Sequence, residues 1–425
     1  MRRVLLALLA VLLIAPAAVL VYQMRQHPDR AYPARPVADR AAQLERGAYL
    51  ARAGDCMACH TARGGQPYAG GRGIATPFGE VVAPNITPDP DTGIGNWSAD
   101  DFWSALHNGR GRDGRFLYPA FPYTSYTKVS REDSDAMYAW LRGVAPVQQQ
   151  NREHGLRFPY NQRWLLAGWR ALYFQPGVYE PVAARPAQWN RGAYLVQGLG
   201  HCVACHSSRN ALGATAVHAD LSGGLIPISN WYAPALTPGS ATGLGDWSAA
   251  DLATLLKTGV SARSAVYGPM AEVVAQSLQY LSDDDTQAMA VYLKSLPQHA
   301  PPPAQEMATG PQAERVLQQG ARLYETHCVE CHRADGAGKP PAYPRLAGNH
   351  ALVASVVNPI RMVLNGGYPP STAGNPRPYG MPPFGPLMND EEVAAVVSYV
   401  RASWGNQGAA VGAGAVSRYR SVPLE

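Results

Sequence analysis

Three copies of the pentapeptide C-x-x-C-H constrain this chain more than any other feature of its sequence. They are Cys56-Met57-Ala58-Cys59-His60, Cys202-Val203-Ala204-Cys205-His206 and Cys328-Val329-Glu330-Cys331-His332. This spacing is typical of covalent c-type haem attachment, in which two thiols bond the porphyrin and the histidine binds the iron. One copy alone is also compatible with a zinc site or a thiol redox pair. Because the three copies use all six cysteines, no further sulfur remains for a tetrahedral zinc site, and the sequence predicts three haem c groups.

The length and composition agree with three small domains built around cofactors. The chain has 425 residues, 46% of them hydrophobic and 16% charged, which is typical of a folded protein. Its 37 prolines and 42 glycines indicate loop-rich domains. The formal net charge is only +5 and there is no basic stripe, so nucleic-acid binding is not indicated.

An uncharged apolar run near the N-terminus indicates the compartment. It covers Val4–Tyr22 and follows two arginines. As a helix it would span about 28 Å, close to the thickness of the hydrocarbon core of a membrane. We expect residues 1–24 to be a membrane anchor; a signal peptide cleaved after Ala17 is the alternative. In both cases the positive flank stays in the cytoplasm, and the rest of the chain lies on the periplasmic side of the bacterial cytoplasmic membrane.

The sequence around each haem motif repeats. The first copy follows Arg46-Gly47-Ala48-Tyr49-Leu50, the second follows Arg191-Gly192-Ala193-Tyr194-Leu195, and the third follows Gln319-Gly320-Ala321-Arg322-Leu323-Tyr324. Repetition on this scale indicates an array of domains and not a solenoid. We expect three haem domains, at residues 41–145, 187–297 and 312–406. Between and after them lie the linkers 146–186 and 298–311 and a flexible tail at 407–425.

Capping patterns mark where helices begin. A serine or asparagine followed three positions later by an acidic residue is typical of a helix N-terminus. The pairs are Ser98–Asp101, Ser130–Asp133, Ser248–Asp251, Ser282–Asp285 and Asn389–Glu392. The helices after Ser98 and Ser248 are expected to run to Leu106 and Leu256. The other three pairs open the helix that closes each repeat.

The two linkers differ in composition. The second contains Pro301-Pro302-Pro303 and indicates a stiff spacer. The first is apolar and aromatic from Trp164 to Phe174. We expect that segment to pack against the haem domains; a docking surface for a partner or for the bilayer is the alternative.

A methionine is the usual sixth ligand of a c-type haem and raises its reduction potential. It is expected on the loop before the closing helix of each repeat. Met270 and Met381 occupy that position in the second and third repeats, so both are predicted iron ligands. Met289 lies within a closing helix and Met388 lies next to one, so both are expected in the core.

The first repeat departs from this pattern, because Phe121 stands where a methionine is expected and phenylalanine cannot bind iron. The sixth position of the first haem is then open, or it is filled by Met137 or by another residue such as His107 or His154. Met137 corresponds to Met289, which favours a core position for both, and both histidines are better explained as packed or surface residues. We therefore expect this haem to have the lower reduction potential or to be high-spin.

Together these motifs resemble the three-haem cytochrome c subunit of membrane-bound bacterial dehydrogenases. The resemblance is carried by the haem motifs and by residues 76–79, 85–89, 92–98, 118–126 and 379–384. It implies an all-α fold of three tandem cytochrome c domains behind the anchor or signal segment. It also implies that a glycine before each haem motif packs against an aromatic residue of the closing helix. The expected pairs are Gly47 with Tyr138, Gly192 with Tyr292 and Gly320 with Tyr399.

In that family an alcohol, gluconate, sorbitol, fructose or an aldehyde is oxidised on a large subunit that carries a flavin, a quinone cofactor or molybdopterin. The resemblance implies that this chain is not itself catalytic, takes electrons from such a subunit and passes them to ubiquinone or a terminal acceptor in the respiratory chain. A small third subunit is a further expected partner. A free-standing carrier between quinol and a terminal oxidase, and a haem peroxidase, are the alternatives. No dinucleotide-binding, nucleophile-elbow or phosphate-loop motif occurs in the sequence.

Overall fold

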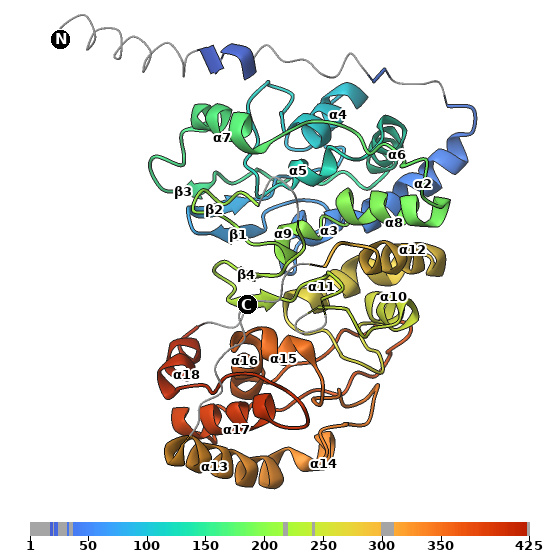
Figure 1. The fold of residues 1–425 in the computed structure, drawn as a ribbon. Helices are drawn as coiled ribbons and strands as arrows, with labels where there is room; N and C mark the ends of the chain where they lie inside the picture. The colour runs from blue at the N-terminus through green and yellow to red at the C-terminus, as the bar shows by residue number, and fades with distance from the viewer. Residues whose placement is uncertain are drawn as a thin grey trace, which may run out of the picture. The chain divides into compact units, whose positions relative to one another are not determined.

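The computed structural model describes residues 18–19, 21–23, 32–33, 37–215, 220–239, 243–298 and 310–422 (Figure 1). They divide into two compact units. Unit 1 spans Met1–Ala184, Tyr194–Ala204 and Arg209–Ala219, and unit 2 spans Arg185–Ala193, Cys205–Ser208 and Asp220–Glu425. Most of the predicted anchor and of the proline-rich linker lies outside the described residues. Among the helices that are described, none is both long and apolar enough to cross a membrane.

The elements of unit 1 are α2 (Arg40–Ala53), α3 (Cys56–Cys59), β1 (Gly73–Thr76), β2 (Gly79–Val82), α4 (Ala99–Asn108), α5 (Tyr123–Tyr126), α6 (Arg131–Leu141), β3 (Gly155–Leu156), the 3-10 helix η2 (Arg163–Leu165) and α7 (Leu166–Tyr173). Both units receive residues from α8 (Ala187–Gln197) and α9 (Val203–His206). Unit 2 continues with β4 (Gly224–Ile226), β5 (Trp231–Ala233), α10 (Ala249–Thr258), α11 (Pro269–Gln276), η3 (Leu278–Tyr280) and α12 (Asp283–Lys294). Its remaining helices are α13 (Pro311–His327), α14 (Val329–His332), α15 (His350–Ala354), α16 (Val357–Asn365), α17 (Asp390–Ala402) and α18 (Ala413–Arg420).

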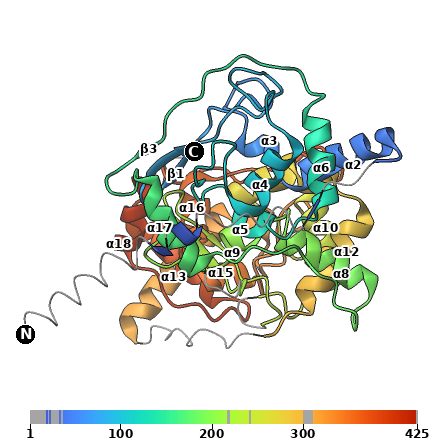
Figure 2. The ribbon, with the colours of Figure 1, turned by 90° about the horizontal axis from the view of Figure 1, so that it is seen from above.

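In the first repeat, α2 packs beside the closing helix α6 (Figure 1), and Figure 2 shows the same pair from above. A β-carbon on Gly47 would lie 2.0 Å from the Ala136 carbonyl oxygen and 2.9 Å from the β-carbon of Trp140, so only glycine fits this crossing. The prediction that Gly47 packs against Tyr138 is therefore wrong. Side chains two positions apart in a helix, such as Tyr138 and Trp140, lie on different faces. The Tyr138 ring instead packs against Phe102, with ring centroids 5.6 Å apart.

The same close crossing occurs in the second and third repeats, within unit 2. A β-carbon on Gly192 would lie 2.9 Å from the β-carbon of Tyr292, and one on Gly320 would lie 2.7 Å from that of Tyr399. Both predicted glycine–tyrosine pairs are confirmed. Each crossing glycine also meets a backbone carbonyl of the closing helix within 2.2 Å of this β-carbon position, so the contact is one of backbone against backbone.

All the predicted helix starts are confirmed. In each, the side chain of the capping residue accepts a hydrogen bond from the backbone amide three positions later. Helices α4 and α10 extend to Asn108 and Thr258, slightly beyond their predicted ends. They stop there because Gly109 and Gly259 adopt the left-handed conformation, at φ 59° and 80°, which is a common helix terminator.

An arginine beside each of the first two crossing glycines binds the closing helix. Arg46 donates to Asp133 at 2.5 Å, and Arg191 donates to Asp285 through two nitrogens, at 2.8 and 2.7 Å. Each aspartate also lies in the capping pattern of that helix. The third repeat has glutamine in place of the arginine, and there the side chain of Glu392 turns back to the capping residue instead. The repeated Arg-Gly pair is thus explained by one packing geometry.

Two small antiparallel sheets qualify the all-α prediction, although the fold is rich in helix. One has the order β1-β2-β3, with Gly73 opposite Val82. The other pairs β4 with β5, with Gly224 opposite Ala233. All of these strands are at most four residues long, too short for an alternating pattern to be seen in the sequence.

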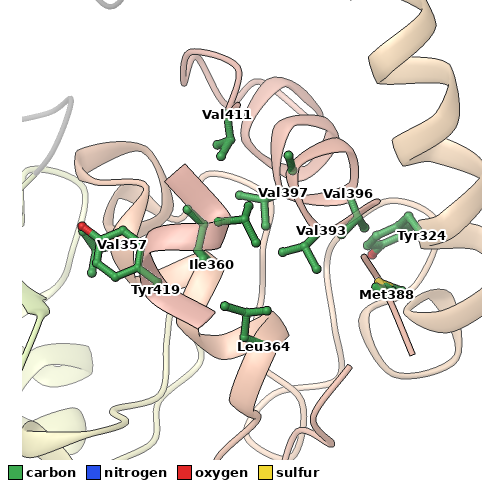
Figure 3. Packing of buried hydrophobic residues seen from close by; sticks show 12 residues of the cluster. Tyr324, Val357, Ile360, Leu364, Met388, Val393, Val396, Val397, Val411 and Tyr419 are labelled. Carbon is green, nitrogen blue, oxygen red and sulfur yellow. The ribbon is translucent and has the colours of Figure 1, made fainter. Parts of the chain in front are cut away.

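The core of the third repeat lies among α16, α17 and α18 (Figure 3). Met388 is buried in it, as predicted. Val416 and Tyr419 of α18 complete this core and are only 0% and 9% exposed. The segment expected to be a flexible tail therefore contains a packed helix, because two apolar residues three positions apart lie on one helix face and suffice to dock it.

Candidate haem-binding sites

Each of the three motifs contains four residues of one short helical turn, α3, α9 or α14. The turn brings the amide of His60 onto the carbonyl of Cys56 at 3.0 Å, and the amide of His332 onto that of Cys328 at 2.9 Å. Residues three and four apart in such a turn lie on one side. All six cysteines and all three motif histidines are half-buried. Each motif therefore presents two thiols and an imidazole as one group.

One contact fixes the orientation of all three motif histidines. The Nδ1 atoms of His60, His206 and His332 lie 2.7, 2.6 and 3.0 Å from the carbonyl oxygens of Pro84, Pro234 and Pro344. A carbonyl oxygen only accepts hydrogen bonds, so Nδ1 must carry the proton and Nε2 keeps its lone pair. This is how a metal-binding histidine is held when a second group orients its other nitrogen. The residues present therefore fit a haem iron bound at Nε2.

Burial favours the neutral form of the three motif histidines and of two motif cysteines. It lowers the pKa of all three motif histidines, against the opposing effect of the proline carbonyls, so the uncharged imidazole that binds a metal is favoured. Burial also raises the pKa of the Cys56 thiol to about 12, with Asp55 adding to the effect, and it raises that of the Cys328 thiol to about 11. Both shifts favour the protonated thiol, the less reactive form.

The two methionines predicted as sixth ligands lie in unit 2, in different local structures. Met270 is in the first turn of α11, and a β-carbon on the preceding Gly268 would lie 2.6 Å from the Trp231 ring. Met381 is extended and exchanges two backbone hydrogen bonds with Gly367, at 2.8 and 3.0 Å. Both methionines are half-buried. Their role as iron ligands stays a prediction.

The corresponding loop of the first repeat is built from aromatic side chains. Phe121 precedes α5, and its ring centroid lies 5.3 Å from that of Tyr126. Met137 is 1% exposed within α6, and Met289 is equally buried within α12. Both positions agree with the expected place of these methionines in the core.

Both histidines considered for the first haem are engaged in packing, as expected. His107 stacks on Trp103 with ring centroids 4.3 Å apart, and it is 1% exposed. His154 accepts a hydrogen bond from the Val82 amide at its Nδ1, at 3.1 Å. Neither contact involves a haem motif.

Sequence reasoning missed the proline carbonyls, although a signal for two of them exists. The first two repeats share the pattern A-P-x-x-T-P, at 83–88 and 233–238. In both, the motif histidine binds the carbonyl of the first proline of that pattern. The third repeat lacks the full pattern, and Pro344 could not have been found in this way.

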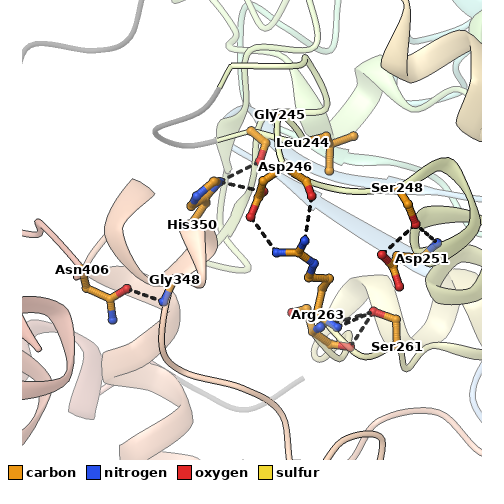
Figure 4. A network of polar contacts seen from close by, with 12 residues as sticks. Leu244, Gly245, Asp246, Ser248, Asp251, Ser261, Arg263, Gly348, His350 and Asn406 are labelled. Atoms are coloured by element: carbon orange, nitrogen blue, oxygen red, sulfur yellow. Dashed lines mark hydrogen bonds and ion pairs between the residues drawn. The ribbon is translucent and has the colours of Figure 1, made fainter. Parts of the chain in front are cut away.

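Sequence reasoning also missed the polar contacts that join the second repeat to the third within unit 2 (Figure 4). The Nδ1 atom of His350 lies 3.0 Å from the Gly243 carbonyl oxygen. The Asp246 carboxylate lies 3.8 Å from the same nitrogen and binds Arg263 at 2.7 Å. One loop of the second repeat is thus held both by its own repeat and by α15.

A second contact between these repeats lies on the strand that leads to the partner of His206. The Asn358 side chain pairs with the backbone of Tyr232 through two hydrogen bonds, of 2.9 and 2.8 Å. The Arg361 guanidinium, which is 1% exposed, lies 4.8 Å from the Trp231 ring. Both partners belong to β5, which leads into Pro234, the residue that orients His206. The third repeat therefore supports the histidine of the second.

Comparisons with known proteins agree with this geometry. The family model described as cytochrome c matches residues 44–145, 190–297 and 317–404. The chain is 44% identical over 383 residues to the gluconate 2-dehydrogenase cytochrome c subunit of Pantoea cypripedii, covering 86% of each protein. It is 42% identical to the cytochrome c subunit of the quinone alcohol dehydrogenase of Gluconobacter oxydans (strain 621H), covering 86% of this chain and 79% of that one. It is 37% identical to the fructose dehydrogenase cytochrome subunit of Gluconobacter japonicus, covering 93% and 87%.

Proposed function

This chain belongs to the cytochrome c family, and on that premise we propose that it is the three-haem electron-transfer subunit of a membrane-bound bacterial dehydrogenase. The observation that carries the proposal is the repeated geometry of the motifs. In each, a proline carbonyl oxygen orients the imidazole of the motif histidine, which follows directly after the second cysteine. Relatives that match most of the chain are cytochrome subunits of gluconate, alcohol and fructose dehydrogenases.

The chain's own residues would hold three haem c groups. The thiols are those of Cys56, Cys59, Cys202, Cys205, Cys328 and Cys331, and the iron ligands are His60, His206, His332, Met270 and Met381. Haem c, when bound, supplies reversible one-electron chemistry. The protein contributes the axial ligands, the burial and the hydrogen bonds that set the potential, and among these hydrogen bonds are those from the motif histidines to the proline carbonyls.

In this function the substrate is oxidised on a separate large subunit that carries a flavin, a quinone cofactor or molybdopterin. The cytochrome subunit takes the electrons and delivers them to ubiquinone or to a terminal acceptor of the respiratory chain. It works on the periplasmic side of the cytoplasmic membrane. The apolar run Val4–Tyr22 supports this location, as do the dehydrogenase relatives.

The test is purification of the full chain from membranes in a mild detergent. We expect a haem content of three per polypeptide, a large subunit in stoichiometric amount, and reduction of the haems when the substrate of that subunit is added. A haem content below three would contradict the cofactor assignment. A chain that purifies alone, with its haems reduced by quinol, would overturn the dehydrogenase assignment in favour of a free-standing carrier.

A further inference from the structure

The outer side of α7 in unit 1 is apolar and exposed. Leu165, Gly168 and Leu172 recur at i, i+3 and i+7 and so form one stripe. Trp169 beside them is half-buried, and its indole N–H donates to the Leu212 carbonyl at 3.0 Å. Leu165 is 38% exposed and Leu172 is 66% exposed, and Trp164, at the start of the same segment, is 58% exposed. None of these residues is charged. We call the stripe together with Trp164 the α7 face.

The opposite side of α7 fixes the helix on unit 1. Leu166 is buried in a cluster with Phe116 and Tyr118, which confirms the expected packing of this linker. The two arginines of the segment also point inward. Arg163 donates to the Phe116 carbonyl at 2.9 Å, and Arg170, 2% exposed, lies 4.9 Å from the Phe116 ring. The α7 face is therefore exposed on a well-packed helix, with the positive charges turned away from it.

The apolar N-terminal run ends beside the same part of unit 1. Gln23, the residue that follows Val4–Tyr22, accepts a hydrogen bond at its carbonyl from Arg110. The Arg110 guanidinium lies 5.0 Å from the Phe116 ring centroid. The arginines next to Gln23 and in α7 thus contact one and the same aromatic ring, so the end of the run lies close to α7, on the side of the helix that packs against Phe116.

From these contacts we propose that the α7 face docks into the interfacial layer of the lipid bilayer, beside the place where the N-terminal run meets the membrane. The proposal rests on the membrane association included in the proposed function. Tryptophan and leucine on an uncharged helix face suit the boundary between lipid headgroups and acyl chains. Protein interfaces also have apolar, aromatic centres, so the observation that favours the bilayer is the position of Gln23, at the end of the apolar run, on the same unit.

The test places a photoreactive benzoylphenylalanine at Leu172 in the full haem-loaded chain, reconstituted in vesicles of phosphatidylcholine and phosphatidylglycerol. The control has the same residue at Leu387, which is 71% exposed in the third repeat. Benzophenone inserts only into C–H bonds that it touches, so a side chain held among acyl chains should give on the order of tenfold more lipid adduct at Leu172 than at the control position. Both positions are exposed, and the haem absorption spectrum verifies that each variant is folded.

Equal lipid labelling at the two positions, or none at Leu172, would overturn the proposal. The same labelling in native membranes separates lipid from protein partners, because an adduct of Leu172 with a large subunit would assign the α7 face to the dehydrogenase instead. A second probe at Trp164 should repeat the lipid result. Failure of the proposed function gives a different result from failure of the bilayer proposal. In that case the chain would take no electrons from a dehydrogenase, but lipid labelling at Leu172 would persist.

Discussion

The hydroxyl of Tyr126 donates to the carbonyl oxygen of Gly54 at 2.7 Å. Gly54 lies two residues before Cys56, the first cysteine of the first haem motif. The ring of the same tyrosine packs edge-on against His201, with centroids 5.7 Å apart, and His201 directly precedes Cys202 of the second motif. Within unit 1, one buried side chain therefore contacts the backbone that leads into one haem motif and the residue that leads into the next.

Replacing Tyr126 by phenylalanine should destabilise this arrangement. The change removes a buried hydrogen bond and leaves the Gly54 carbonyl without that donor, which costs about 1–2 kcal/mol of unfolding free energy. Denaturant unfolding of the haem-loaded protein measures the effect. The matched control is Tyr368→Phe, because the Tyr368 side chain is 69% exposed and its hydroxyl can bond to water, so its loss should change stability little. Equal effects of the two substitutions would contradict the role of the Tyr126 bond.

Substitution of Met270 or Met381 by leucine should remove one methionine–iron bond each. Because the first repeat has Phe121 in place of a methionine, the wild-type protein should show the near-infrared methionine–iron charge-transfer absorption of two haems. Each variant should lose about half of this absorption and lower the potential of one haem, since the thioether raises the potential. The controls are Met289→Leu and Met388→Leu, whose methionines are buried in the core. If a control abolished the band while Met270→Leu or Met381→Leu preserved it, the ligand assignment would be wrong.

Alanine in place of Gly320 should disrupt the crossing of α13 and α17. Its β-carbon would lie 2.2 Å from the Ala395 carbonyl oxygen, and overpacking against backbone is expected to cost roughly 3 kcal/mol or more. Thermal unfolding and the yield of haem-loaded protein report the loss. Gly414→Ala in α18 is the control: no atom lies within 4 Å of its β-carbon position, and glycine-to-alanine in a helix should stabilise by about 0.5–1 kcal/mol. A harmless Gly320→Ala would refute the close crossing.

Acid should weaken the first repeat through His107. Burial lowers the pKa of this histidine from its ordinary 6.5 to about 4. The unfolded chain therefore binds a proton below pH 6.5 that the folded chain does not bind until about pH 4, so stability is lost as pH falls through this window. The loss is on the order of 3 kcal/mol by pH 4.

The variant His107→Phe keeps a ring for stacking on Trp103 and removes the titrating group. Its unfolding free energy, measured from pH 7 to pH 4, should fall less steeply than that of the wild type. Other titrating groups contribute equally to both proteins, so the difference in slope isolates His107. Parallel curves would show that this histidine does not titrate as its burial implies.

The local features of the fold could be read from the sequence because each depends on neighbouring residues. A capping serine binds an amide three positions later, and the cysteines and histidine of a motif stand side by side in the C-x-x-C-H pentapeptide. The pairing of Gly192 with Tyr292 was predicted correctly, whereas Trp140 was missed as the partner of Gly47. In that case two aromatic residues stand two positions apart in α6, and only the packing of the helix selects between them.

The sequence by itself therefore determined where the helices begin and predicted where haem is attached. Only the tertiary structure decided which carbonyl orients each motif histidine, because Pro84, Pro234 and Pro344 lie 24, 28 and 12 positions away along the chain. It also decided that the α7 face is exposed, because that depends on which side of α7 packs against Phe116. The physical reason is the same in both cases: helix capping and the spacing of a single turn are local interactions, while burial and the choice of hydrogen-bond partner are set by residues that only folding brings together.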